Sequence, residues 1–301
     1  MSDYLEVAKQ GRNDWWRYLI SFPAILAIWL VIGSIPVVLL VTYVAMDDDP
    51  ATGFSGTGFT GIPVHLEFLI TMSSFIPFLI ATLLAVRLIH ERPLKTLVTG
   101  KARIRWGRMF TGAGVWLLIA ALLSGLESLL YPGRYVLTFQ PVAWLIFALL
   151  ALILIPLQTS AEEFFFRGYI LQWMGLRLKN KWILSLLNGA LFFLPHAANP
   201  EMAATANSLL VGLGYFVIGF FFTFITLQDR GMELALGMHA SNNLFAGLFA
   251  NYEVTALPSP SLFTVQTLDP VYSLISLVIG MFLFYLVFFF PTRSGSATLP
   301  G

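Results

Sequence analysis

The chain has 301 residues, of which 57% are hydrophobic and only 11% are charged, and its formal net charge is +1. A charged share less than half of the roughly 25% usual in soluble proteins excludes a disordered chain and an ordinary soluble enzyme. The charge balance without a basic domain argues against nucleic-acid binding. Because the chain has no cysteine, disulfides, a thiolate nucleophile and a cysteine-based zinc site are excluded. The remaining class is a polytopic membrane protein.

Apolar stretches long enough for membrane-spanning helices, which need about 20 residues, recur along the whole sequence. The eight expected helices cover residues 18–46, 64–86, 109–131, 142–159 or beyond, 182–198, 207–227, 234–250 and 270–290. The fifth and seventh are short and carry polar residues. The sequence contains no internal repeat, so it predicts one all-α membrane domain over residues 1–301. Its motif-bearing core is expected at about 142–250 and a disordered tail at about 292–301.

Positive charges divide the expected loops into two sets. Basic residues concentrate at 87–108 and 177–181 and occur also at 9–17, Arg230 and Arg293. The loops on the other side contain Arg134 as their single basic residue, together with several acidic ones. By the positive-inside rule, both termini are expected in the cytoplasm. The compact eight-helix frame and the lack of an organelle signal suggest a prokaryotic plasma membrane.

The first polar cluster inside an expected helix contains two adjacent glutamates and an arginine. If the fourth helix continues to about Leu176, Glu162 and Glu163 lie inside the bilayer, where ionisable groups are costly and indicate function. Glu163 and Arg167 are four positions apart and can form an ion pair. Glu162 points about 100° away from Glu163 and lacks that partner, so its carboxylate suits a general base. The alternative is a cluster that merely ends a helix at the membrane surface.

Two further clusters fall in the fifth and seventh expected helices. His196 follows Pro195 in an otherwise apolar stretch, and its alternative explanation is a core histidine bonded to a backbone carbonyl. His239 and Asn243 are four positions apart on one helix face. They could hold an oxyanion or form a hydrogen-bond clamp between helices. Asn242 could replace Asn243 geometrically, although the spacing favours Asn243.

In chain order, Glu-Glu-x-x-x-Arg at 162–167, Phe-x-x-x-His at 192–196 and His-x-x-x-Asn at 239–243 form a specific set. The set resembles the CPBP family of intramembrane proteases, also called the CAAX-protease and bacteriocin-processing or Abi family. The best-known branch of that family is the Ras-converting CAAX endopeptidase. The motifs cover residues 162–243, and the eight-helix frame fits the whole chain.

The resemblance implies a role for each residue that matches a motif. Glu162 and His196 would activate a water, while His239 and Asn243 would stabilise the oxyanion. Glu163 and Arg167 would support the site without taking part in the reaction. The implied function is an intramembrane endopeptidase of the CAAX-protease type. Its expected partners are a membrane-associated or lipidated peptide or protein substrate and the lipid bilayer, with no nucleic acid.

Three alternatives are weighed against this function. A non-proteolytic scaffold or immunity protein of the same fold would not need all four site residues. A proton-coupled transporter could use the same acids and histidines, but it would favour repeated halves, which the sequence lacks. A metal site could form from Glu162, His196 and His239. The sequence contains no His-Glu-x-x-His motif, and the resemblance favours a metal-free mechanism, so we expect no metal and no cofactor.

The depth of two residues in the membrane tests this arrangement. Glu162 lies about 14 residues, or roughly 21 Å, before a membrane exit near Leu176, and His196 lies equally far beyond Trp182. The two side chains can therefore meet only if the fourth helix continues well past Thr159. We expect such a helix, together with a water-filled cavity that opens to the cytoplasm.

Overall fold

The computed structural model describes residues 3–55 and 58–290, so the tail expected at about 292–301 lies outside the described residues. The longer helices are α2 (Trp15–Ala27), α3 (Ile35–Met46), α4 (Val64–Ser73), α5 (Phe75–Leu84), α7 (Trp106–Leu130), α8 (Pro141–Glu163), α10 (Lys181–His196), α12 (Ser208–Asp229), α13 (Glu233–Leu248) and α14 (Pro270–Phe289). Four shorter helices are α1 (Asp3–Glu6), α6 (Lys95–Val98), α9 (Leu171–Gly175) and α11 (Pro200–Ala203). Turns of other helical types are η1 (Val7–Gln10), η2 (Ile28–Ile32), η3 (Ala85–Ile89) and η4 (Phe164–Ile170).

Within the described residues, six helical segments are long and apolar enough to cross a membrane. They are Trp15–Met46, Val64–Ile89, Trp106–Leu130, Pro141–Gly175, Ser208–Asp229 and Pro270–Phe289. They confirm the predicted class, an all-α polytopic membrane protein. The other two expected helices, α10 and α13, have 16 residues each. At about 24 Å they are shorter than a hydrocarbon core of roughly 30 Å, so the count of eight spans stays a prediction.

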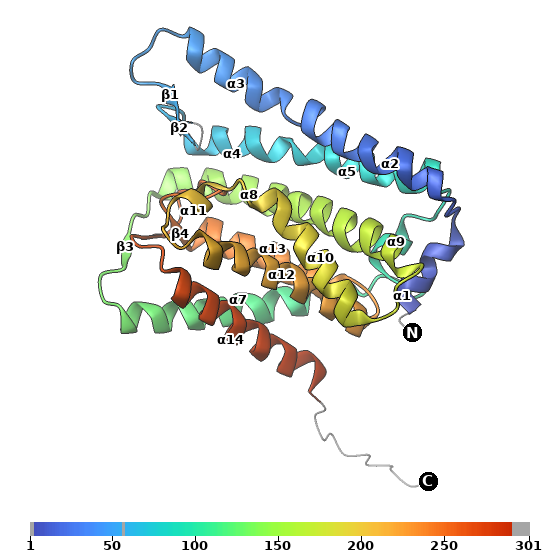
Figure 1. Ribbon diagram of the computed structural model, residues 1–301. Helices are drawn as coiled ribbons and strands as arrows, with labels where there is room; N and C mark the ends of the chain where they lie inside the picture. The colour runs from blue at the N-terminus through green and yellow to red at the C-terminus, as the bar shows by residue number, and fades with distance from the viewer. Residues whose placement is uncertain (1–2, 56–57, 291–301) are drawn as a thin grey trace.

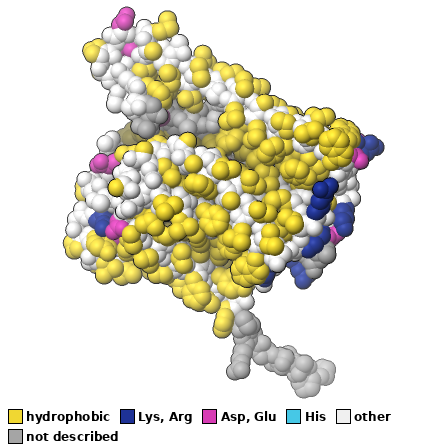
Figure 2. Space-filling model, in the orientation of Figure 1, with side chains coloured by type: hydrophobic (Ala, Val, Ile, Leu, Met, Phe, Trp, Pro, Cys, Tyr) yellow, Lys and Arg dark blue, Asp and Glu magenta, His cyan; other side chains and the backbone are white. Residues whose placement is uncertain are grey.

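On the face that Figure 2 shows, hydrophobic side chains cover most of the helical body, and the charged side chains lie toward its two ends. Leu122, Leu149 and Phe282 are at least 60% exposed, as expected for residues that face lipid. The loops rich in Lys and Arg, at 87–108 and 177–181, gather at the end that also carries α1 and α9 (Figure 1). We call this the basic end, and we call the opposite end, which carries the β-strands, the strand end.

In the described ranges, five short strands form two small sheets, and these lie at the strand end (Figure 1). β1 (Gly53–Phe54) pairs antiparallel with β2 (Phe59–Thr60). β5 (Phe263–Val265) lies in the middle of a second sheet, antiparallel to β3 (Tyr135–Leu137) and parallel to β4 (Ala250–Tyr252). The second sheet joins the loop before α8 to the segment after α13, and both of these helices carry site residues.

Helix α13 lies in the middle of the bundle, in contact with α7, α8 and α12 (Figure 1). Its approach to α7 is close at Gly237, where an added Cβ would lie 2.1 Å from the carbonyl oxygen of Met109. Helix α10 approaches α12 in the same way at Gly189, where a Cβ would lie 2.9 Å from the backbone nitrogen of Phe220. Small residues of this kind let helix backbones meet in a membrane.

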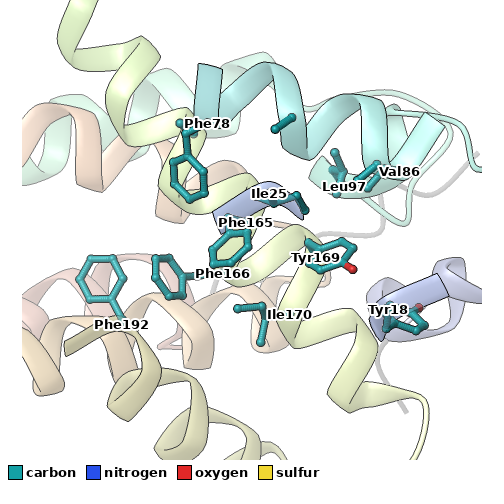
Figure 3. Close-up of a cluster of buried hydrophobic side chains, with 13 residues drawn as sticks. Tyr18, Ile25, Phe78, Val86, Leu97, Phe165, Phe166, Tyr169, Ile170 and Phe192 are labelled. Carbon is teal, nitrogen blue, oxygen red and sulfur yellow. The ribbon is translucent and has the colours of Figure 1, made fainter. Parts of the chain in front are cut away.

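A cluster of buried hydrophobic side chains fixes the chain just after the two glutamates (Figure 3). Phe165 of η4 packs against Phe78 of α5 with ring centroids 5.0 Å apart. Phe166 meets Phe192 of α10 edge to face at 5.2 Å. The cluster joins helices α2 and α5 to the rest of the bundle, next to the buried glutamates Glu162 and Glu163.

Candidate active site

The fourth expected helix continues far past Thr159. α8, η4 and α9 form one helical segment from Pro141 to Gly175, which confirms the extension that the site requires. The seven residues after Glu163 are π-helical, a conformation that often occurs at functional sites. Glu162 and Glu163 lie inside this segment and are 6% and 0% exposed.

Glu163 links two of the predicted site residues through one carboxylate oxygen. Its Oε1 accepts a hydrogen bond of 2.9 Å from Nη1 of Arg167 and lies 2.8 Å from Nδ1 of His239. Arg167 also donates through Nη2 to the carbonyl oxygen of Gly219 at 3.0 Å. Because a carboxylate only accepts, Nδ1 of His239 carries the proton. The predicted pair of Glu163 and Arg167 therefore forms, fully buried, and it orients the His239 ring.

Glu162 has different surroundings from Glu163. Its Oε2 lies 3.5 Å from Nε2 of His239 and makes no hydrogen bond to any residue that the structure describes. The side chain lines a cavity of about 710 Å³. His196, His239 and Asn243 line the same cavity, so the structure brings the four predicted catalytic residues together. Their chemical roles stay predictions.

His196 combines the two explanations offered for it. Its Nδ1 donates to the carbonyl oxygen of Phe192 at 2.7 Å, as expected of a core histidine. That bond fixes the tautomer and leaves Nε2 as an acceptor. The ring lies on the cavity wall, with its centroid 4.5 Å from that of Tyr215. His196 can therefore hold a water through Nε2 while the carbonyl fixes its ring.

The two adjacent asparagines belong to a chain of four side chains. The indole nitrogen of Trp116 donates to Oδ1 of Asn242 at 3.1 Å. Nδ2 of Asn242 then donates to Oδ1 of Asn243 at 3.2 Å, and Nδ2 of Asn243 donates to Oε1 of Gln158 at 3.1 Å. Because an indole N–H can only donate, it fixes the orientation of each amide that follows. Each of the two amides retains one N–H for a ligand, and both side chains line the cavity, so the choice of Asn243 stays a prediction from the spacing.

Sequence reasoning missed three residues that contact the predicted site. Gln158 is 6% exposed and lies one turn before Glu162 on the same helix face, a signal that the sequence did contain. Tyr215 stacks on His196, and its hydroxyl bonds to Oε1 of Glu201. Oε2 of Glu201 accepts from the backbone nitrogen of Ala256 at 2.9 Å, which fastens the segment after β4 beside the cavity.

The cavity was expected to open toward the basic end, where the sequence places the cytoplasm, but its lining does not extend to that end. Beyond the site residues, its lining continues to Phe54 and Phe59 of the first sheet, Glu201 of α11, and Tyr252 and Pro258 after α13. All of these belong to the strand end (Figure 1). The expectation failed because it was derived from helix lengths alone, which set the depth of Glu162 and not the side from which it is reached.

The described residues, 3–55 and 58–290, contain no group of three or more His, Cys, Asp or Glu side chains that could hold a metal ion. Glu162, His196 and His239 share the cavity without forming such a set. The prediction that the protein needs no metal and no cofactor has to be tested by measuring its activity.

The fold and the site define a polytopic membrane protein with a carboxylate and two histidines facing a cavity inside the helical bundle. The sequence profile of the family described as "Type II CAAX prenyl endopeptidase Rce1-like" matches residues 138–245, which include all three motifs. The uncharacterized protein YyaK of Bacillus subtilis (strain 168) is 31% identical over 267 residues, which are 87% of either chain. The chain belongs to the Rce1-like CAAX protease family, as the resemblance predicted. No solved structure matches it significantly.

Proposed function

We propose that the protein is an intramembrane endopeptidase in which Glu162 and His196 activate a water that attacks a peptide bond. One observation carries the proposal. The buried carboxylate of Glu162, with Oε2 free of hydrogen bonds to described residues, faces the same cavity as His196, His239 and Asn243. Membership of a protease family supports a peptidase function. We further propose that the substrate is a membrane-associated or lipidated polypeptide.

The reaction follows from the position of each polar atom. A water held between Glu162 and Nε2 of His196 gives a proton to the Glu162 carboxylate as its oxygen attacks the carbonyl carbon. The negative charge that develops on the carbonyl oxygen is held by the free N–H of Asn243. When the C–N bond breaks, Glu162 returns the proton to the leaving amine, and the carboxylate is regenerated.

His239 is the second group suited to the oxyanion. Its Nδ1–H is bound by Glu163, and Glu162 lies beside its Nε2. The ring form with an N–H on Nε2 is the one that can donate to an oxyanion, and Nε2 is the ring nitrogen not bound by Glu163. Glu163 and Arg167 act through His239: the carboxylate orients the imidazole, and the guanidinium compensates the buried charge of Glu163.

The proposal is tested with purified protein in detergent and a mixed library of lipidated and unlipidated C-terminal peptides. We expect the wild type to cleave some of these peptides, with and without a chelator, and Glu162→Gln to cleave none. Glu253→Gln, which changes an exposed glutamate outside the cavity, is the matched control and should keep wild-type activity. Activity lost on chelation would instead indicate a metalloprotease. Cleavage by Glu162→Gln at the wild-type rate would exclude Glu162 as the base.

A further inference from the structure

The two short helices determine where the molecule is hollow. Helices α10 and α13 begin at the basic end, where Asn180 caps α10 and Arg105 binds Glu233, the first residue of α13. Each extends only about 24 Å, less than the hydrocarbon core. After α10 the chain enters the short α11, and after α13 it enters β4 and a non-helical stretch. Residues of both segments, within 199–201 and 250–258, line the cavity. The hollow therefore lies toward the strand end.

The basic end is closed beneath the glutamates. Tyr4 of α1 is fully buried, and its hydroxyl lies 3.2 Å from the carbonyl oxygen of Arg167. Gln172, also fully buried, donates to the carbonyl oxygen of Thr96 at 2.7 Å. A hydrophobic cluster fills the space around them with Leu5, Val98, Leu171, Leu184, Leu227 and Met232. These contacts separate Glu162 from the basic loops.

Charge distinguishes the two ends. The basic end carries the loops rich in Lys and Arg, whereas the described loops of the strand end contain one basic residue, Arg134. Arg134 is bound by Glu127 at 2.8 Å and by Asp269 at 3.4 Å. Its charge is therefore compensated locally, and the asymmetry across the membrane is strong. By the positive-inside rule, the basic end lies in the cytoplasm.

We infer that the active site is reached from the face of the membrane opposite the cytoplasm, and that its substrates are membrane-anchored polypeptides with the cleaved segment exposed on that face. The inference rests on the proposed function and adds to it the side of attack. The part of the cavity wall formed by Trp29, Met72, Phe75 and Ile218 is apolar and lies within membrane-spanning segments. It suits the apolar anchor of such a substrate. A peptide held on the cytoplasmic face would meet the closed end.

The direction of the opening can be measured without a substrate, because the chain has no cysteine and single thiols can be introduced into a clean background. We choose three single alanine-to-cysteine variants. Ala256→Cys and Ala246→Cys place a thiol on the cavity lining, and Ala102→Cys places one in the basic loop. Intact protoplasts are treated with a membrane-impermeant thiol reagent. We expect Ala256→Cys and Ala246→Cys to be modified, and Ala102→Cys only after the cells are disrupted.

The reverse pattern, with Ala102→Cys modified in intact cells and the other two protected, would overturn the inference. Full modification of all three variants after denaturation shows that every thiol is present and that protection reflects topology. The substrate side is tested with sealed vesicles of known orientation and the cleavable peptides. Cleavage restricted to inside-out vesicles would contradict the inference. If the thiols are labelled as expected but no peptide is cleaved in either orientation, the direction of the opening stands. The peptidase proposal, and the substrate class with it, would then be rejected.

Discussion

Glu163 and His239 lie 76 positions apart in the chain, yet Oε1 of one and Nδ1 of the other are 2.8 Å apart. The same oxygen neutralises Arg167, which is fully buried. Glu162 directly precedes Glu163. Among the described residues it makes no ion pair with an arginine, and its side chain lines the cavity. Two adjacent and chemically identical side chains therefore have separate tasks, because a helix directs consecutive residues about 100° apart.

The two glutamates should respond differently to the same substitution. Glu163→Gln leaves the Arg167 charge uncompensated in the protein interior and should lower the free energy of unfolding by about 3–5 kcal/mol. Glu162→Gln breaks no buried ion pair with an arginine. It should therefore lower stability much less than Glu163→Gln does, and it should reduce kcat by at least about 100-fold, as for loss of a general base. Thermal unfolding in detergent and peptide cleavage measure the two effects.

A control separates stability from chemistry in this pair. Glu163→Gln should recover part of its activity when measured at a temperature where the variant is folded, whereas Glu162→Gln should not recover at any temperature. Equal losses of stability in the two variants would show that Glu162 is also required for the fold, and the separation of tasks would be incorrect.

The parts of this arrangement that are local in the chain could be predicted from the sequence. The pair of Glu163 and Arg167 follows from a four-residue spacing, and the depth of Glu162 follows from helix rise. The partners of the two asparagines could not be predicted, because Trp116 meets Asn242 and Gln158 meets Asn243 only through the packing of three helices. The direction of the cavity depends on how the segments after α10 and α13 fold, and hydropathy carries no information about that.

Trp116 should position the oxyanion donor without touching the substrate. Trp116→Phe removes the N–H that orients Asn242 and, through it, Asn243. We expect kcat to fall by about tenfold with KM unchanged, less than the 10²–10³ typical of losing an oxyanion donor itself. Steady-state kinetics on a peptide from the library would measure this split.

Trp144→Phe is the matched control for that variant. The Trp144 indole also donates a hydrogen bond, of 2.8 Å to the carbonyl oxygen of Leu248, but it lies outside the cavity lining. Its loss should lower stability by about 1 kcal/mol and leave kcat unchanged. A similar fall of kcat in both variants would mean that the effect of Trp116→Phe is general loosening of the bundle and not amide orientation.

Asn243 and Asn242 can be distinguished by truncating each to alanine. Asn243→Ala removes the free N–H proposed to hold the oxyanion and should reduce kcat by about 10²–10³-fold. Asn242→Ala breaks the hydrogen bonds that connect Trp116 to Asn243, so the loss should be closer to that of Trp116→Phe. If Asn242→Ala has the larger effect, the two asparagines exchange roles and the four-residue spacing from His239 is not the deciding feature.

The close approach of α13 to α7 should be the most sensitive point in the packing that places His239. An alanine Cβ at 237 would lie 2.1 Å from the carbonyl oxygen of Met109 and 3.0 Å from the backbone nitrogen of Ala113, and backbone atoms cannot move aside as a side chain can. Gly237→Ala should therefore separate the two helices, lower the free energy of unfolding by about 1–3 kcal/mol and reduce activity through the displaced imidazole.

Gly114 of α7 offers the opposite case on the neighbouring helix. An added Cβ there meets nothing within 4 Å, so Gly114→Ala should gain up to about 1 kcal/mol from helix propensity alone with activity retained. Thermal unfolding and cleavage rates of the two variants, prepared side by side, test the pair. If Gly237→Ala proves as stable and as active as Gly114→Ala, the contact at Met109 is looser than described, and the position of His239 must depend on its bond to Glu163 rather than on the approach of the helices.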